Sequence, residues 1–374
     1  MNVALSRFTV LCTVATLLIT VSTVEGYDAA SNEAPIIASP TPMPESAWSG
    51  TAVYSASPAY GYSPAATRYV RDYGGWSGVV GPSPKIFATV EGIGLRMNGG
   101  TRHANSVVID QDTTQTLLTT HDTQYDMEAR YRVTAGARFN NGLLVEGTFF
   151  QITEWDATAI ALGNNNLTLD GDLGLVGTAD FFDVDEFTLR QRATLDNWEI
   201  NSFWPEGVTD FSWLVGVRYV DLNESYNINA FDLDSGTSIY DIAARNRLYG
   251  VQIGGRYKRD FGRLGLDFIL KTGLYANDAK QHSLITGFDG ASTVRDVTMD
   301  QTRAAFIGEL GLSGTLQLAS WAWLKAGYSV IWMEGIARAA NQLDLSATST
   351  SSQFIDFTSG ALIHGVNLGF ETRW

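Results

Sequence analysis

From residue 85 to the end of the chain, apolar and polar positions alternate with a period of two. In residues 128–139, Glu128 and Arg130 share one face of such a segment, whereas Tyr131 and Val133 share the other. Strict alternation is typical of β-strands whose two faces meet different surroundings. Glycine, which weakens helices, is scattered through every segment. The pattern therefore predicts an all-β domain over residues 85–374.

The connections between these segments alternate in length, long and then short. Short turns at one end and long loops at the other are characteristic of outer-membrane barrels, and an even number of strands keeps both termini in the periplasm. We therefore expect a transmembrane antiparallel up-and-down β-barrel of ten strands, or twelve if a long loop contains a hairpin. The expected strands are residues 85–97, 125–139, 143–154, 186–203, 209–225, 245–260, 263–279, 302–318, 321–340 and 360–374.

The last segment ends on an aromatic residue. Trp374 lies on the same face of the expected strand as Val366, Leu368 and Phe370. The assembly machinery of bacterial outer membranes reads a terminal aromatic residue of this kind, so these four residues form the expected assembly signal. Barrel-assembly machinery and outer-membrane lipid are the expected partners. The lipid-facing band is expected to include Tyr131, Val133, Phe211, Val215, Val217, Leu266, Phe268, Leu310, Leu312, Tyr328, Val330, Leu368 and Phe370.

The first 84 residues have a different composition. Arg7 precedes an apolar run, and Val24 and Gly26 suit the −3 and −1 positions of a cleavage site, so residues 1–26 read as a cleaved export signal. A single membrane anchor is the alternative. Eight of the nine prolines fall in residues 27–84. Because proline is excluded from sheet interiors, this stretch is expected to be a periplasmic linker. The expected location is the cell outer membrane.

Charge and motif content exclude several classes of function. The formal net charge is −15, from 25 Lys+Arg against 40 Asp+Glu, so nucleic acid is not an expected partner. The single cysteine, Cys12, lies in the expected signal. None of the common catalytic, phosphate-binding or dinucleotide motifs is present. We expect no enzyme activity, no catalytic residues, no cofactor and no metal.

Two alternatives from the expected loops stay open. Paired carboxylates could bind Ca²⁺ at the surface, although none has EF-hand spacing. A hydrolytic site at the rim could use Asp110, Asp112, His121 and Asp122, although their spacing does not require one. The paired carboxylates are Asp170/Asp172, Asp183/Asp185/Glu186 and Asp232/Asp234.

The polar faces of the expected strands should line the barrel interior, because lipid surrounds the outside. On this basis the wall is rich in cations, with carboxylates such as Asp196 and Asp267 opposite them. The lining or constriction candidates are Arg130, Arg132, Arg138, Arg190, Arg192, Arg218, Arg256, Lys258, Lys271, Glu146 and Glu309. They form either a ladder of ion pairs that braces a narrow interior or an anion-biased constriction.

Four short motifs follow one another along the chain, at residues 131–142 (YRVTAGARFNNG), 214–224 (LVGVRYVDLNE), 326–332 (AGYSVIW) and 365–374 (GVNLGFETRW). In content and order they resemble the pore-forming barrels of the Legionella major-outer-membrane-protein-like family and the related planctomycete family. The resemblance implies an outer-membrane barrel with a narrow pore for passive diffusion of small solutes. The alternative function is a closed structural or adhesive surface barrel with acidic extracellular loops. The sequence does not indicate an oligomeric state.

Overall fold

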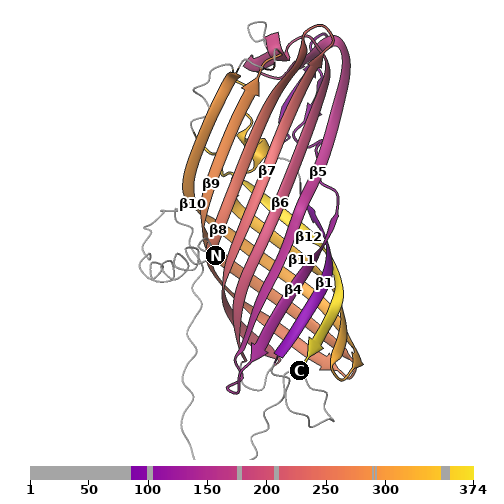
Figure 1. Ribbon diagram of the computed structural model, residues 1–374, viewed down its shortest axis with the longest axis vertical. Helices are drawn as coiled ribbons and strands as arrows, with labels where there is room; N and C mark the ends of the chain where they lie inside the picture. The colour runs from indigo at the N-terminus through magenta and orange to yellow at the C-terminus, as the bar shows by residue number, and fades with distance from the viewer. Residues whose placement is uncertain are drawn as a thin grey trace, which may run out of the picture. The chain divides into compact units, whose positions relative to one another are not determined.

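Ten antiparallel strands close into a barrel, as expected (Figure 1). β1 pairs with both β4 and β12, and β5 pairs with both β4 and β6, which closes the ring. The barrel strands are β1 Ile86–Met97, β4 Glu128–Arg138, β5 Leu144–Leu169, β6 Val184–Pro205, β7 Phe211–Asp232, β8 Gly236–Phe261, β9 Leu264–Thr286, β10 Thr293–Ala319, β11 Ala322–Ile336 and β12 Ser359–Arg373.

The computed structural model describes residues 86–98, 104–174, 179–205, 210–288, 290, 293–346 and 354–374. The expected signal, residues 1–26, and the expected linker, residues 27–84, lie outside the described residues. In the described part of the chain, no helix is long and apolar enough to cross a membrane.

Two further strands form a hairpin within the first long loop. β2, Ser106–Asp110, pairs with β3, Thr116–Thr119, and also with the end of β5. The hairpin expected as an alternative therefore exists, but it lies beside the barrel wall. Three short 3-10 helices complete the loops: η1 Asp172–Gly174, η2 Ala179–Phe181 and η3 Ala339–Gln342.

The short turns confirm the hairpin reading of the sequence. In the Asn140-Asn141-Gly142 turn, the amide of Gly142 donates to the carbonyl of Phe139 over 2.9 Å. Gly142 has φ +87°, a backbone conformation that glycine adopts without steric cost. Both ends of the barrel sequence also meet at this short-turn end, where the amide of Trp374 donates to the carbonyl of Ile86.

The barrel wall is much taller on one side than on the other (Figure 1). β5 to β10 have 22 to 27 residues each, whereas β1, β4, β11 and β12 have 11 to 15. Several expected strand ends were therefore wrong, because parts of the expected loops continue the wall. β5 extends to Leu169, β8 begins at Gly236, and β10 begins at Thr293. In contrast, the expected strand 321–340 ends early, at Ile336.

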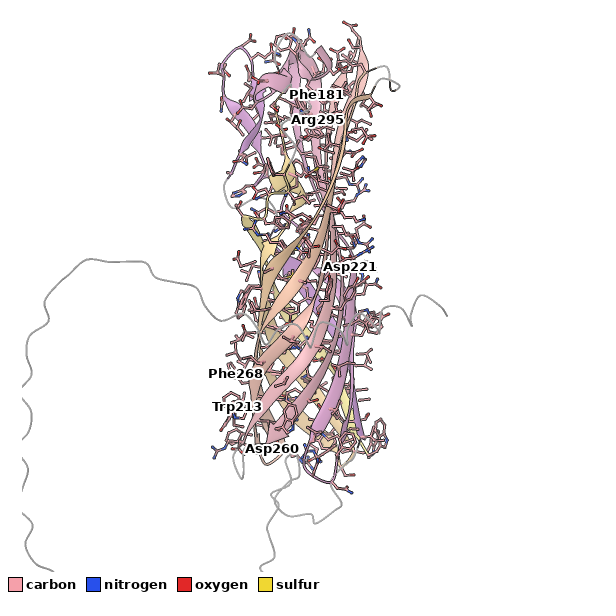
Figure 2. The ribbon with its side chains drawn as sticks, turned by 90° about the vertical axis from the view of Figure 1, so that its left-hand side faces the viewer. Phe181, Trp213, Asp221, Asp260, Phe268 and Arg295 are labelled. Carbon is pink, nitrogen blue, oxygen red and sulfur yellow. The ribbon has the colours of Figure 1, made fainter. Side chains whose placement is uncertain are left out.

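An apolar band surrounds the outer face toward the short-turn end. Its upper limit is a row of polar side chains that lie directly opposite one another on neighbouring strands: Asp196, Asp221, Arg247 and Asp278. Figure 2 shows Trp213 and Phe268 in the lower part of the wall and Asp221 above them. An outward-facing apolar band of this kind is typical of membrane barrels. The band therefore marks the segment that contacts lipid.

Substitutions on the outer face of β10 should test this band. Replacing Leu310 with arginine is expected to lower the free energy of unfolding by about 2–4 kcal/mol, because it places a charge in the lipid-facing band. Leu310 is 36% exposed on the outer face. The matched control is Thr302→Arg, on the same face at the upper limit of the band and opposite Asp278, which should be tolerated. Denaturant titration of the refolded proteins in micelles measures the free energy of unfolding of both variants. Equal effects would contradict the position of the band.

Candidate functional site: the barrel interior

Four buried charges form a network across the lower lumen. Lys271 on β9 places its Nζ 2.9 Å from Glu199 Oε2 on β6 and 2.9 Å from Glu309 Oε1 on β10. Arg218 on β7 donates from Nη1 to Glu309 Oε2 over 2.7 Å. We name Glu199, Arg218, Lys271 and Glu309 the tetrad. β6 and β9 are not neighbours, so the tetrad connects separated parts of the wall through the lumen.

Two further charged groups occupy the same level. Glu91 accepts from Arg132 Nε at 2.8 Å and lies 3.4 Å from Lys325 Nζ. Arg256 on β8 contacts Asp267 on the next strand, and its Nη1 donates to Glu146 on β5 over 3.2 Å. The Arg256–Glu146 pair also joins strands that are not neighbours. The lumen therefore has several ion pairs that cross it.

Lumenal cations and carboxylates nearly balance in the described part of the barrel. The expected excess of cations arose because Arg130, Arg138, Arg190 and Arg192 were assigned to the lumen and Glu199 was not. The buried or half-buried lumenal cations are Arg132, Arg218, Arg256, Lys258, Lys271, Lys325 and Arg373, and the carboxylates are Glu91, Glu146, Glu199, Asp267, Glu309 and Glu371.

The candidates Arg190 and Arg192 lie on the outer face, so their assignment to the lumen was wrong. Arg190 pairs with Asp156, and Arg192 Nε lies 3.8 Å from Glu154. The inward side chains of this part of β6 are those of alternate residues such as Gln191. The reason is that β6 rises above the lipid band, where the apolar face turns inward and the polar face meets water. Asp196 was misassigned for the same reason.

The remaining candidates divide between the lumen and its rims. Arg130 lies at the long-loop end of β4, where its Nε donates to Thr153 over 2.8 Å. Arg138 is the last residue of β4, at the opposite rim. Glu199 was not among the candidates, although it alternates with the outward Trp198 and Ile200, a pattern that would have identified it. The candidates that the structure brings together in the lumen are Arg132, Arg218, Arg256, Lys258, Lys271, Glu146 and Glu309.

Apolar side chains occupy the lumen directly above this charged level. Trp155 on β5 is fully buried, and its indole Nε1 donates to the carbonyl of Leu95 over 3.0 Å. The other members come from most of the barrel strands and form one contiguous cluster. They include Ile93, Phe150, Ile152, Leu195, Val220, Leu248, Tyr275, Ile307, Ile331, Met333 and Ile363.

A loop segment enters the barrel above this apolar cluster. Arg338, two residues beyond the end of β11, is 0% exposed and donates from Nε to both carboxylate oxygens of Glu224 at 2.9 and 2.7 Å. Its Nη1 and Nη2 donate to the carbonyls of Gly360 and Asn98. Asn246 on β8 exchanges two hydrogen bonds with the backbone of Ala337. Side chains of β7 and β8, together with the backbone carbonyls of Asn98 and Gly360, thus fix this loop inside the wall.

Electrostatics around Arg338 favour its charged form. Burial alone would lower the pKa of Arg338, but the neighbouring Glu224 carboxylate raises it above the usual value. Tyr125, in the segment before β4, is buried nearby, and burial together with Glu224 raises its pKa well above the usual range. Both side chains therefore keep one protonation state at ordinary pH.

A small cavity remains within the charged level. It has a volume of about 80 Å³ and is lined by charged side chains that include Glu91, Arg132, Glu146, Arg256 and Lys271. A water needs roughly 10–15 Å³ when volume is measured in this way, so the cavity has room for several waters.

The family model with the description "Putative beta barrel porin-7 (BBP7)" matches residues 96–374 of the chain. The chain belongs to the BBP7 family. It is an outer-membrane β-barrel of porin type. No curated protein matches the chain.

Several solved structures are similar to this BBP7 chain at low identity. The outer membrane protease OmpT from Escherichia coli has 8% identity and a TM-score of 0.39, with 80% of this chain and 100% of that chain covered. The translocator domain of the autotransporter NalP from Neisseria meningitidis has 10% identity and a TM-score of 0.38, with 80% and 91% covered. The toluene transporter TbuX from Ralstonia pickettii has 8% identity and a TM-score of 0.27, with 78% of this chain and 90% of that chain covered.

Two of the paired loop carboxylates of the BBP7 barrel accept hydrogen bonds from backbone amides in its turns. Asp232 Oδ1 accepts from the amides of Asp234 and Ser235, and Asp185 accepts from the amides of Asn165 and Leu233. Among the residues with described positions, no group of three or more His, Cys, Asp or Glu could hold a metal ion. At the expected rim, Asp122 Oδ2 accepts from the amide of Thr119. The charged interior remains the strongest candidate site.

Proposed function

We propose that this outer-membrane barrel is closed to passive diffusion and acts as a structural surface barrel. The observation that carries the proposal is the lumen-crossing tetrad beneath a continuous apolar cluster. The loop held by Arg338 and Glu224 lies above the tetrad and the apolar cluster, and it also supports the proposal. This is the alternative function that the sequence left open, and the tall wall adds a broad polar surface at the long-loop end.

The energy of the tetrad supports the closed state. Separating a buried ion pair leaves charges without compensation and costs about 3–5 kcal/mol per pair. A solute that passed through the lumen would have to separate Lys271 from Glu199 and Glu309, and then displace the side chains around Trp155. Tight packing of this kind has low compressibility, so ordinary fluctuations do not open a path.

Proteoliposome swelling tests the proposal directly for neutral solutes. Vesicles that contain the refolded protein should not swell in isotonic arabinose, and vesicles with a general porin should swell. Heat-modifiable migration in gels confirms that the reconstituted protein is folded. Swelling at a rate that falls with increasing sugar size would overturn the closed barrel.

A narrow pore is the second candidate function. It is implied by the resemblance to the Legionella and planctomycete families and favoured by the charged cavity of about 80 Å³. In a pore, Arg132→Gln should weaken anion preference because Arg132 lines this cavity. Arg192→Gln should not change it, because Arg192 lies on the outer face beside Glu154. Reversal potentials of the two variants distinguish this pore from a leak through the bilayer.

A further inference from the structure

The upper part of β10 has a neighbouring strand on one side only. β9 pairs with β10 from Thr293 onward, whereas β11 pairs with it only from Phe306. Residues 293–305 therefore form a sheet edge at the margin of the tall wall in Figure 1, with residues 293–301 above the lipid band and Thr302 at its upper limit, opposite Asp278. Such an edge presents unpaired N–H and C=O groups to which another strand can add.

The hydrogen-bond pattern identifies the free backbone groups. The amide of Gln317 donates to the carbonyl of Arg263 on the β9 side, so odd-numbered residues of β10 turn their backbone groups toward β9. The register has no irregularity from Arg295 to Leu316. Even-numbered residues therefore point their N–H and C=O groups to the open side. Among the described residues, none pairs with them there. Those without a described neighbour are Asp296, Thr298, Asp300 and Thr302, and all are exposed.

The corresponding edge of β5 is shielded. β2 pairs with β5 at Leu167–Leu169, and the segment before β4 packs against it, with the ring of Tyr125 6.2 Å from that of Trp155. On β10, Gly335 lies against the carbonyl of Ala304, whereas residues 296–302 have no comparable cover from the described residues. The accessible edge is thus on β10.

The side chains of the β10 edge define what an added strand would meet. Asp296 and Asp300 point outward, four residues apart. Asp296 has His282 of β9 as its neighbour, with 3.0 Å between His282 Nε2 and Asp296 Oδ1. Val297 and Met299 point inward and are half-buried, and Met299 packs against the apolar cluster inside the tall wall. Lys280 of β9 lies directly opposite Asp300. The outward face of the edge thus presents two carboxylates, and the inward face is apolar at Val297 and Met299 and polar further down, at Gln301 and Arg303.

We propose that the β10 edge, residues 296–302, binds an extended segment of another protein by strand addition. The segment has Lys or Arg on its outward face, opposite Asp296 and Asp300, and apolar residues on its inward face, beside Val297 and Met299. Backbone hydrogen bonds supply affinity in this mode, and alternate side chains supply specificity. A second copy of this chain fits poorly, because antiparallel self-pairing places aspartates opposite each other, and like charges destabilise cross-strand pairs.

A charge-swap experiment tests the chemistry of the partner. The probe is a fluorescent peptide with the core Lys-Val-Thr-Val-Lys, and its control has Glu in place of both Lys. Fluorescence anisotropy with the refolded full barrel in micelles should show that the Lys peptide binds about three- to tenfold more tightly. The Asp296→Lys/Asp300→Lys variant should reverse this preference. No saturable binding, or the same preference in both proteins, would overturn the proposal.

A proline variant tests the mode of binding. Thr298→Pro/Thr302→Pro removes two backbone N–H donors that point to the open side of β10. It removes no hydrogen bond to β9, and proline is tolerated on edge strands. This variant should bind the Lys peptide at least about tenfold more weakly, whereas Thr298→Ala/Thr302→Ala should bind as the wild type does. Heat-modifiable migration confirms that both variants fold. Unchanged binding by the proline variant would overturn strand addition, and a wild-type dimer that this variant abolishes would overturn the choice of partner.

Discussion

Replacing Arg338 with methionine is expected to lower the free energy of unfolding by about 3–5 kcal/mol, because the change leaves a buried carboxylate without its partner. Glu224 is as deeply buried as Arg338, with both side chains 0% exposed. The variant also loses the bonds to the carbonyls of Gly360 and Asn98. Guanidinium titration in micelles, followed by tryptophan fluorescence, measures the change.

Two comparisons make the Arg338 result specific. Arg192→Met removes an arginine from the outer face, where the side chain is 46% exposed, so it should change stability by about 1 kcal/mol or less. Adding Glu224→Gln to Arg338→Met should recover part of the loss, because it removes the uncompensated charge. Equal losses in Arg338→Met and Arg192→Met would contradict the role assigned to the loop.

Replacing Lys271 with methionine should have an effect of similar size, about 3–5 kcal/mol. Lys271 lies between Glu199 and Glu309, so its loss leaves two buried carboxylates with Arg218 as the nearest compensating charge. Adding Glu199→Gln restores the charge balance of the tetrad. The double variant should therefore lose less stability than the sum of the two single variants, by about 0.5–3 kcal/mol. Additive losses would show that the tetrad is not one network.

The membrane-spanning part of the fold followed from the sequence, and the part above the membrane did not. In the lipid band, Leu266, Phe268 and Leu270 face outward and Asp267 and Lys271 face inward, as the alternation predicts. Above the band the polar residues of the alternation face outward and the apolar residues face inward, because the outer face meets water. Arg190 and Arg192 were therefore assigned to the wrong face. The residue at which the two faces exchange depends on how far the membrane reaches along the barrel, and the pattern of one strand does not encode this.

The closure of the lumen was also beyond local sequence reasoning. Arg338 fell within an expected strand, 321–340, but the strand ends at Ile336, just after Gly335 with φ +75°. Its partner Glu224 is more than a hundred residues away in the chain. Similarly, parity placed Lys271 and Glu309 in the lumen, but it did not indicate that Lys271 reaches Glu199 across the barrel. Pairs of this kind depend on how the strands close.

Planar-bilayer recording of the folded full-length barrel tests the central claim most directly, because ions detect openings that are too small for sugars. The protein is first shown to be folded by heat-modifiable migration, and a general porin serves as the positive control. We expect no discrete conductance steps from the wild-type protein, because the tetrad, the apolar cluster and the Arg338 loop all fill the lumen. Stable, stepwise conductance with a preference for anions would contradict the closed barrel and establish the narrow pore.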